Sequence, residues 1–275
     1  MLQYQEGDVR VEGINIHYYR TGSDKPPFVL LHGATDNGLC WTPVAGMLAE
    51  DYDVIMVDAQ GHGKSDRVDP RFNSNSLASQ VVGLLKELGI KKPVIMGHSM
   101  GAGTTVNIAV NYPDVPRAII LEDPVWRPPE VLNAEPSAEE KRIQEGFARL
   151  VENQGKLNVA EIIEQGRKDN PRWSEEELKP WAEAKKQFDP SLLKRVRPDS
   201  RPYEGLVPKI QCPTLLITAE NGIVPPGVPE RAAALWKSDK PFKWVRIDGA
   251  GHNIRREQYE EFKRNMTQFL GALAG

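Results

Sequence analysis

The 275-residue sequence lacks the features that mark several large classes of protein. It contains only two cysteines, Cys40 and Cys212, so a scaffold held by disulfides is not expected, and Cys40 is interpreted as a buried structural thiol. No run of about 18 apolar residues occurs, and the N-terminus lacks the apolar segment of a signal peptide. We therefore expect a soluble cytoplasmic protein without a membrane partner.

An excess of charge of one sign is also missing, because 35 basic and 38 acidic residues leave a net charge of −3. This balance gives no electrostatic reason to expect binding to nucleic acid or to an anionic membrane. The acidic run at residues 175–177 is expected on a solvated helix face. Neither an H-E-x-x-H motif nor a paired-cysteine spacing is present, so the sequence contains no recognisable metal-binding motif.

What the sequence does contain is a G-x-S-x-G motif, formed by Gly97, Ser99 and Gly101. Residues 94–96 before it are apolar and β-prone, and residues 103–112 after it are typical of a helix. A serine on a sharp turn from a strand into a helix is a nucleophile elbow. The tight turn requires small flanking residues and presents the hydroxyl to a base, so Ser99 is the predicted nucleophile.

Three further motifs follow expected strands: H-G-A at residues 32–34, D-x-x-G-x-G-x-S at residues 58–65, and D-G-A-G-H at residues 248–252. Together with the elbow, they resemble the motifs of the α/β-hydrolase fold superfamily, in particular its serine esterases and lipases. The resemblance covers the whole chain apart from a middle insert. It implies an α/β fold with a mostly parallel central sheet flanked by helices, an inserted α-helical cap, and no cofactor.

The hydrophobic pattern along the chain agrees with this architecture. Residues 9–19 alternate around Glu12 and Gly13, which predicts an antiparallel hairpin at a sheet edge. Buried strands are predicted at residues 28–31, 54–57, 94–97, 118–121, 214–218 and 243–247, and helices near 41–49, 76–88, 101–112, 228–237 and 256–272. Residues 125–206, between the predicted strands at 118–121 and 214–218, contain only helical patterns. The predicted division is therefore a core of residues 1–124 and 207–275 and a helical cap of residues 125–206.

A serine hydroxyl needs a general base within hydrogen-bond reach to act as a nucleophile near neutral pH. His17 lies in the expected edge hairpin and is interpreted as a surface residue. His98 adjoins Ser99 and is expected to point away from it on the elbow. His252 alone lies on a loop just beyond the last expected strand, in the chain order nucleophile, acid, histidine. His252 is the predicted base.

The sequence departs from the commonest family pattern at the acid. Many members carry a segment like G-x-x-D-x-I-V-P after the seventh strand, whereas this chain has Asn221 where that aspartate would fall. An amide can orient the imidazole but carries no charge to stabilise the imidazolium. The strand at 118–121 ends in Glu122 and Asp123, and some branches of the superfamily take their acid from this place. Asp123 is therefore the predicted acid, Glu220 is the alternative, and Glu122 is a third candidate.

These residues predict hydrolysis by acyl transfer. Ser99 is expected to attack a carbonyl with His252 as base, while the backbone N–H groups of Ala34 and Met100 form the oxyanion hole. Trp126, which follows the predicted acid, is the residue best placed to line a substrate pocket. The expected substrate is a small or medium carboxylic ester or a lactone, which makes the protein a carboxylic ester hydrolase.

Other activities of the same fold remain open. A cofactor-free haloperoxidase or perhydrolase and a C–C bond hydrolase use the same triad, and slow-turnover ligand receptors and signalling proteins retain it. Haloalkane dehalogenases and epoxide hydrolases are disfavoured, because their nucleophile is an aspartate where Ser99 stands.

Overall fold

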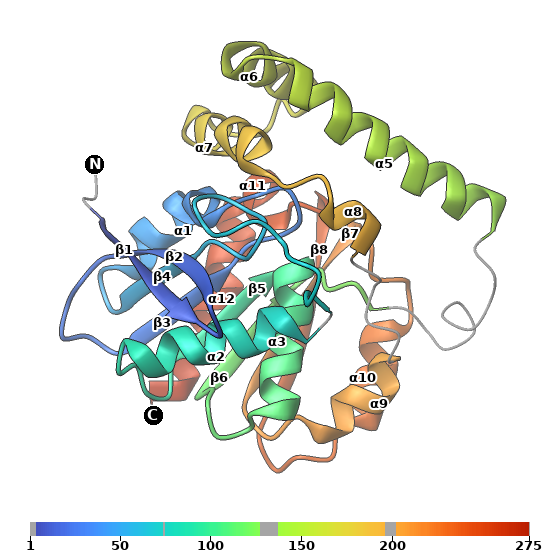
Figure 1. The fold of residues 1–275 in the computed structure, drawn as a ribbon. Coiled ribbons are helices and arrows are strands. Elements are labelled where there is room, and N and C mark those ends of the chain that lie inside the picture. The colour runs from blue at the N-terminus through green and yellow to red at the C-terminus, as the bar shows by residue number, and fades with distance from the viewer. Residues whose placement is uncertain (1–3, 74, 127–136, 196–201, 275) are drawn as a thin grey trace.

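The computed structural model describes residues 4–73, 75–126, 137–195 and 202–274, and Figure 1 shows their arrangement. An eight-stranded sheet with the order β1-β2-β4-β3-β5-β6-β7-β8 runs through the centre of the molecule. Strands β3 to β8 pair in parallel, whereas β1 and β2 pair with their neighbours in antiparallel orientation. The mostly parallel sheet predicted from the sequence is confirmed.

The strands lie where the hydrophobic pattern predicted them, and β3 to β6 are buried almost throughout. Their bounds are β1 (Gln5–Val11), β2 (Ile14–Arg20), β3 (Pro27–Leu31), β4 (Asp53–Val57), β5 (Val94–His98), β6 (Ala118–Glu122), β7 (Thr214–Asn221) and β8 (Phe242–Gly251). The last two strands run further than predicted. They do so because Asn221 pairs with Gly251 beyond a register shift that follows Ala219.

The β1–β2 hairpin forms the edge of the sheet, as predicted, and it turns at Glu12 and Gly13, which both have positive φ. His17 on β2 is only 4% exposed, so its interpretation as a surface residue is wrong. The reason is that β1, rather than β2, is the edge strand, because β2 pairs with β4 on its other side. The His17 ring is covered by Tyr19, and its Nδ1 lies 2.9 Å from Oδ1 of Asp8.

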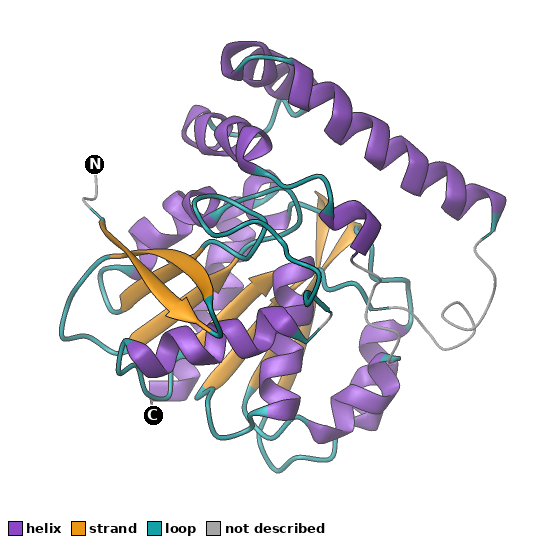
Figure 2. Cartoon of the chain, in the orientation of Figure 1, coloured by secondary structure: helices purple, strands orange, loops and turns teal. Residues whose placement is uncertain are grey.

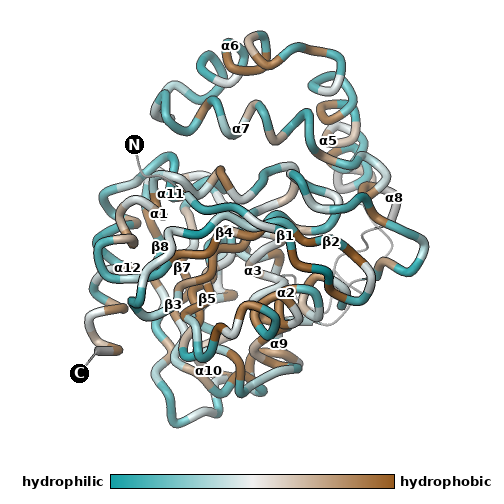
Figure 3. Tube along the Cα trace, turned by 60° about the vertical axis from the view of Figure 1, so that its left-hand side comes forward, coloured by the Kyte–Doolittle hydropathy of each residue, from teal (hydrophilic) through white to brown (hydrophobic). Residues whose placement is uncertain are grey.

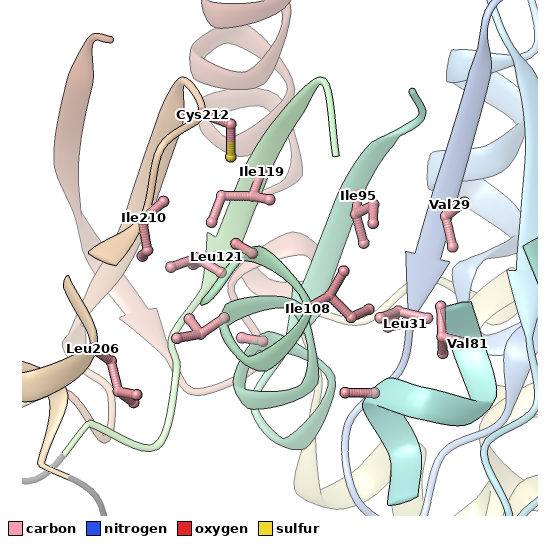
Figure 4. Close-up of a cluster of buried hydrophobic side chains, with 14 of the residues drawn as sticks. Val29, Leu31, Val81, Ile95, Ile108, Ile119, Leu121, Leu206, Ile210 and Cys212 are labelled. Atoms are coloured by element: carbon pink, nitrogen blue, oxygen red, sulfur yellow. The ribbon is translucent and has the colours of Figure 1, made fainter. Parts of the chain in front are cut away.

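Alternating side chains of the central strands pack on the two faces of the sheet, as the two-residue period of a strand requires. Figure 4 shows one face, where strand residues such as Val29, Ile95 and Leu121 meet Val81 and Ile108 of the helices α2 (Ser76–Glu87) and α3 (Met100–Asn111). On the other face, the intervening strand residues pack against helices α1 (Thr42–Leu48) and α12 (Tyr259–Ala274). Each layer of helices thus covers one buried apolar surface of the sheet (Figure 2).

The remaining helices of this core differ slightly from the predicted segments. The segment near 41–49 is split into a short 3-10 helix η1 (Gly38–Trp41) and α1, because the Asn37 side chain accepts a hydrogen bond from the Cys40 amide and begins η1 one turn earlier. The helix predicted near residues 256–272 begins two residues earlier, with α11 (Ile254–Glu257), and Gln258 separates α11 from α12. Helix α10 (Val228–Leu235) lies close to its predicted position.

Between β6 and β7, the described residues 137–195 form what we call the helical insert, which consists of α5 (Ala138–Lys156), α6 (Val159–Asp169), α7 (Glu175–Gln187) and α8 (Leu192–Arg195). Of the three longer helices, α7 lies nearest to the core and α5 reaches outward beyond it, while the short α8 lies beside the core, where Leu192 packs against Gly61 (Figure 1). Hydrophobic residues are concentrated on the central strands and are scattered along α5 to α7 (Figure 3).

Two residues near the ends of the predicted cap pack against the core. Trp126 and Tyr203 stack with ring centroids 5.4 Å apart, and both are buried in the same apolar cluster as α2 and α3. Helix α9 (Tyr203–Leu206) and the 3-10 helix η2 (Val207–Lys209) continue this packing. These residues therefore lie on the core, and the helical insert also contacts it, for example through the amide of Asp189, which donates to the carbonyl oxygen of Gly61 at 2.8 Å.

None of the helices in the described parts of the chain is both long enough and apolar enough to span a membrane.

Candidate active site

The predicted catalytic residues follow the carboxyl ends of parallel strands of the sheet. Ser99 comes directly after β5, Asp123 follows β6, and His252 follows β8. The loop that follows β3 lies on the other side of β5. β3 pairs with β4 on one side and with β5 on the other, so the chain connections that leave β3 and β5 run in opposite directions along the sheet. Open α/β sheets form their ligand crevice at such a place.

The elbow has the strained geometry expected of a nucleophile. Ser99 has φ 52° and ψ −111°, a conformation that costs a non-glycine residue about 1–3 kcal/mol. A Cβ atom on Gly97 would collide with the backbone of Gly101, and one on Gly101 would collide with the carbonyl group of Leu31. The two glycines therefore allow α3 to pack directly against β5 and β3, which holds the turn that carries Ser99.

His252 and Asp123 form the central pair of the site. The ring Nδ1–H of His252 donates to Oδ2 of Asp123 at 2.7 Å, and the Asp123 side chain is fully buried while that of His252 is 31% exposed. His98, the residue before Ser99, also contacts His252: its Nε2 donates to the carbonyl oxygen of His252 at 2.9 Å. This contact joins the elbow to the loop that carries the base.

The loop after β7 holds the carboxylate of Asp123 with its backbone. The amide of Ile223 donates to Oδ2 at 2.9 Å, and the amide of Val224 donates to Oδ1 at 3.4 Å. A Cβ atom on Gly222 would lie 2.6 Å from both carboxylate oxygens, so only glycine allows this approach. The segment that carries Asn221 in place of an aspartate thus supplies amide donors to Asp123. Sequence reasoning missed this role of residues 222–224.

The two other candidate acids have different partners. Glu220 accepts a hydrogen bond from the amide of Gly249 at 2.9 Å, and its side chain is 43% exposed. Glu122 is fully buried and forms an ion pair with Arg255 at 3.1 Å. Burial raises the pKa of Glu122, and the charge of Arg255 opposes that rise. The geometry therefore favours Asp123 as the partner of the imidazole.

Of the two amides expected to form the oxyanion hole, one belongs to the elbow and the other to the loop after β3. Met100 is the first residue of α3, where the helix dipole favours negative charge, and Ala34 is exposed in the loop after β3. Gly33 brings this loop against the elbow, since a Cβ atom there would lie 2.6 Å from the His98 ring and 3.5 Å from Cβ of Ser99. In the part of the chain that the structure describes, neither amide donates a hydrogen bond to another protein group.

The D-x-x-G-x-G-x-S stretch supports this loop. The carboxylate of Asp58 accepts from the amide of Gly38 at 2.7 Å and from the amide of Lys64 at 2.8 Å. Ser65 donates to the Asp58 carbonyl at 2.6 Å and accepts from the backbone of His17. These bonds fasten the loop after β4 to both the hairpin and the loop after β3, so they position the site.

A buried group of six charged side chains lies beside the candidate triad, and sequence reasoning did not find it. We call this group the ionic cluster; its acids and bases are Asp36, Glu122, Glu177, Lys185, Arg255 and Arg256, all with side chains at most 5% exposed. Its three acidic and three basic groups balance, which is how buried charges are tolerated. The cluster joins the loop after β3, the end of β6, helix α11 and the helical insert.

Asp36 is the centre of the ionic cluster. Its carboxylate lies 2.9 Å from Arg256, 3.3 Å from Arg255 and 3.1 Å from Lys185. Burial alone would raise the pKa of Asp36, but the charges of Arg256, Lys185 and Arg255 outweigh burial and hold that pKa well below its usual range. The loop after β3 thus carries a buried negative charge at Asp36, two residues after Ala34.

The acidic run at residues 175–177 was expected to be solvated, and this expectation is wrong for Glu177. Glu177 is 3% exposed and binds Arg256 at 2.9 Å, whereas Glu175 and Glu176 are exposed. The helical period explains the difference, because one residue of any three consecutive helical positions can face a neighbouring layer. Trp173 covers Arg256 with its ring centroid 4.7 Å from the guanidinium.

Two further observations concern residues singled out from the sequence. Cys40 is fully buried against the insert, and burial raises the pKa of its thiol to about 12, so it is an inert structural thiol as predicted. Trp126 is 4% exposed and is accounted for by core packing, so its contact with substrate stays a prediction. Among the described residues, no group of three or more His, Cys, Asp or Glu side chains is arranged to hold a metal ion.

A strained serine between a parallel strand and a helix, next to a histidine–aspartate pair at the same sheet edge, defines the class of α/β hydrolases. The sequence matches the Alpha/beta hydrolase family over residues 28–264, and the chain belongs to that family.

Relatives within the family carry several activities. N-formylmaleamate deformylase of Pseudomonas putida is 26% identical over 272 residues, which is 96% of each chain. A 2-(acetamidomethylene)succinate hydrolase of Mesorhizobium japonicum is 31% identical over 115 residues, which is 42% of this chain and 41% of that relative. A solved structure of an E-2-(acetamidomethylene)succinate hydrolase superposes with a TM-score of 0.78 at 20% identity, covering 98% of this chain and all of that one.

One solved relative is described as an esterase. The malate-bound thermophilic esterase from Thermogutta terrifontis superposes with a TM-score of 0.71 at 25% identity, covering 98% of this chain and 99% of that one.

Proposed function

We propose that this protein is a serine hydrolase that cleaves a small or medium carboxylic ester or a lactone through an acyl-enzyme on Ser99. The observation that supports the proposal most directly is the bond from His252 to the buried Asp123 beside the strained elbow that carries Ser99. A histidine oriented by a buried carboxylate is the base that a serine nucleophile requires.

In the proposed reaction, His252 removes the proton of Ser99 while the serine oxygen attacks the substrate carbonyl. The resulting oxyanion is bound by the amides of Ala34 and Met100, each worth about 3 kcal/mol of transition-state stabilisation. The imidazolium, stabilised by Asp123, then protonates the leaving alcohol. His252 next activates a water molecule, which attacks the acyl-enzyme and releases the acid and the free serine.

The helical insert is proposed to act as the cap over this site. Helix α7 reaches the loop after β3 through polar contacts: Lys185 donates to Thr35 and Asp36, and Asn37 donates to Gln187 at 2.8 Å. An apolar cluster that includes Cys40, Trp181 and Ile162 completes the contact. A layer that covers the carboxyl edge of the sheet in this way excludes water from the reacting groups.

A second candidate function is hydrolysis of an N-acyl compound. Its support is the deformylase and the acetamidomethylene-succinate hydrolase among the relatives, since both names describe substrates with an acyl group on nitrogen. The same triad serves both reactions, because His252 can protonate a leaving nitrogen as well as a leaving oxygen. The two functions differ only in the substrate that the pocket accepts.

The test is a substrate panel with a covalent probe. Purified protein is assayed on p-nitrophenyl esters of increasing chain length, on γ-lactones, and on N-formyl and N-acetyl amides of matched size. Ser99→Ala is expected to lower turnover about 10⁴-fold or more while leaving the thermal unfolding curve intact. A fluorophosphonate probe should add its mass to the peptide that contains Ser99 in the wild type alone.

The panel also separates the alternative activities. Ester or lactone turnover that exceeds amide turnover supports the proposal, and the reverse preference supports the N-acyl function. Labelling without turnover of any substrate points to a receptor or signalling protein that retains the triad. Halide- or peroxide-dependent turnover points to a haloperoxidase or perhydrolase, and cleavage of a vinylogous diketone points to a C–C bond hydrolase. Full activity of Ser99→Ala refutes a serine mechanism altogether.

A further inference from the structure

The loop that carries the proposed oxyanion donor Ala34 contains a strained turn. The amide of Asp36 donates to the carbonyl oxygen of Gly33 at 3.2 Å, which closes a four-residue turn. Thr35, the third residue of that turn, has φ 63°. A positive φ at this position normally requires glycine or asparagine, and it is least favourable for a β-branched residue. Something outside the turn must therefore hold Thr35 in place.

The group that holds Thr35 is Lys185, which comes from the helical insert. Its Nζ donates to the Thr35 carbonyl oxygen at 3.0 Å and to the Thr35 hydroxyl at 2.9 Å. It also donates to Oδ1 of Asp36 at 3.1 Å. One ammonium group has three donors, so these contacts use its full capacity on two consecutive residues of the strained turn.

The position of Lys185 is itself fixed from several sides. Its side chain is 5% exposed, and Nζ lies 4.9 Å from the centroid of the Trp181 ring. Asp36, the ion-pair partner of Lys185, also pairs with Arg256. Arg256 in turn pairs with Glu177, which lies on α7 like Lys185. Helix α7 thus attaches to the turn twice, directly through Lys185 and indirectly through Glu177 and Arg256.

We propose that Lys185 is a positioning residue through which the helical insert holds the turn of residues 33–36 in the conformation that aims the Ala34 amide at the oxyanion. The inference rests on the proposed function, because the amide acts only when a negative oxygen forms on the carbonyl that Ser99 attacks. It means that docking of helix α7 completes the oxyanion hole. The insert therefore contributes to the chemical step as well as covering the site.

The test compares two neighbouring lysines of helix α7. Lys185→Met removes the contacts to Thr35 while keeping the length of the side chain. Lys186→Met is the matched control, because Lys186 is exposed and its Nζ donates to the carbonyls of Gly155 and Leu157 within the insert. With a p-nitrophenyl ester, Lys185→Met is expected to lower kcat by roughly 10- to 100-fold and to change KM by less than about threefold. Lys186→Met is expected to behave as the wild type.

Two additional readouts separate positioning from simple loss of structure. Burst titration with the ester counts active sites, so that kcat refers to folded enzyme alone. An alkylboronic acid forms a tetrahedral adduct on a serine, so its inhibition constant should rise by the same factor by which kcat/KM falls. A purely structural role for Lys185 would lower the number of active sites and the unfolding temperature without changing either normalised constant.

A substitution at the strained residue tests the backbone argument directly. Glycine adopts positive φ without cost, so in a Thr35→Gly background the turn no longer needs the lysine. Lys185→Met should then cost less than about threefold relative to Thr35→Gly itself. An equal loss in both backgrounds would overturn the inference, as would wild-type constants for Lys185→Met. The Ser99→Ala variant is assayed in parallel. Retained activity in Ser99→Ala refutes the proposed function itself, whereas the results for Lys185→Met test the role of the lysine.

Discussion

The core and the helical insert of this protein are stabilised by different interactions. In the core, apolar side chains from both faces of the sheet are sealed between helices, and residues such as Phe262 and Ile119 are fully buried. In the insert, α5 leaves Ile143 62% exposed and Phe147 39% exposed, while α7 sends the charged Glu177 and Lys185 into the interface with the core. The insert thus combines exposed apolar side chains on α5 with buried charged side chains on α7.

The difference has a consequence for function. Apolar burial is not directional and stabilises the core regardless of small displacements, whereas charged hydrogen bonds act only at a fixed geometry. Because the insert is attached through the ionic cluster, its position relative to the catalytic loops is fixed. Apolar contacts alone would not fix it. The cluster reaches both the loop of Ala34, through Asp36, and the end of β6, where Glu122 precedes Asp123.

The largest expected effect lies in the core, at the proposed acid. Asp123→Asn should lower kcat about 10⁴-fold, because an amide cannot stabilise the imidazolium of His252. Steady-state kinetics on the preferred substrate measure the loss. Glu220→Gln is the matched control and should remain within about threefold of the wild type. A deeper loss in Glu220→Gln than in Asp123→Asn would instead assign the role of the acid to Glu220 near the end of β7.

A pair of phenylalanines tests the structural side of the comparison. Phe262→Ala removes a fully buried ring between α12 and the sheet and should lower the free energy of unfolding by about 3–5 kcal/mol. Phe147→Ala on α5 should change it by less than about 0.5 kcal/mol. Urea unfolding followed by circular dichroism measures both values. If Phe147→Ala were as destabilising as Phe262→Ala, the outer face of α5 would be covered in solution and the contrast between the regions would fail.

The last expected effect concerns pH. Burial lowers the pKa of His32, His62 and His98, all of which lie in the core at the carboxyl ends of strands. A histidine with a lowered pKa in the folded state is protonated first in the unfolded chain. Stability therefore falls as the pH drops below about 6.5, by at most about 1.4 kcal/mol per pH unit for each histidine.

Unfolding measured between pH 8 and pH 5 checks the sign and the slope, and His62→Gln should reduce the slope. An unchanged slope would mean that His62 is not buried in its neutral form. Asp36 acts in a separate range: its pKa is lowered, so its stabilisation is complete above about pH 4 and is lost only as the pH falls through that lowered value. The histidine effect of the core and the carboxylate effect of the ionic cluster can thus be separated along one titration.

Much of the fold could be predicted because it depends on local patterns. The apolar runs of β3 to β6, the hairpin turn at Glu12 and Gly13, and the small residues around Ser99 each express their structure within a few positions. The errors arose where a neighbour distant in sequence decides the outcome. His17 is buried because β2 has a strand on both sides, and Glu177 is buried because Arg256 faces it across the insert interface.

The sequence alone determined the chemical inventory: a serine in a turn that only small neighbours permit, a histidine after the last strand, and an asparagine where the commonest acid is absent. Only the tertiary structure decided which carboxylate meets the imidazole, because three acids within reach by sequence differ solely in their spatial partners. It also decided that Lys185 of the insert binds the turn at Thr35, about 150 residues away in the sequence. Hydrogen bonds depend on the distance and direction between atoms, which only the folded chain sets. Such contacts leave no periodic trace in the chain, whereas burial and turn geometry do.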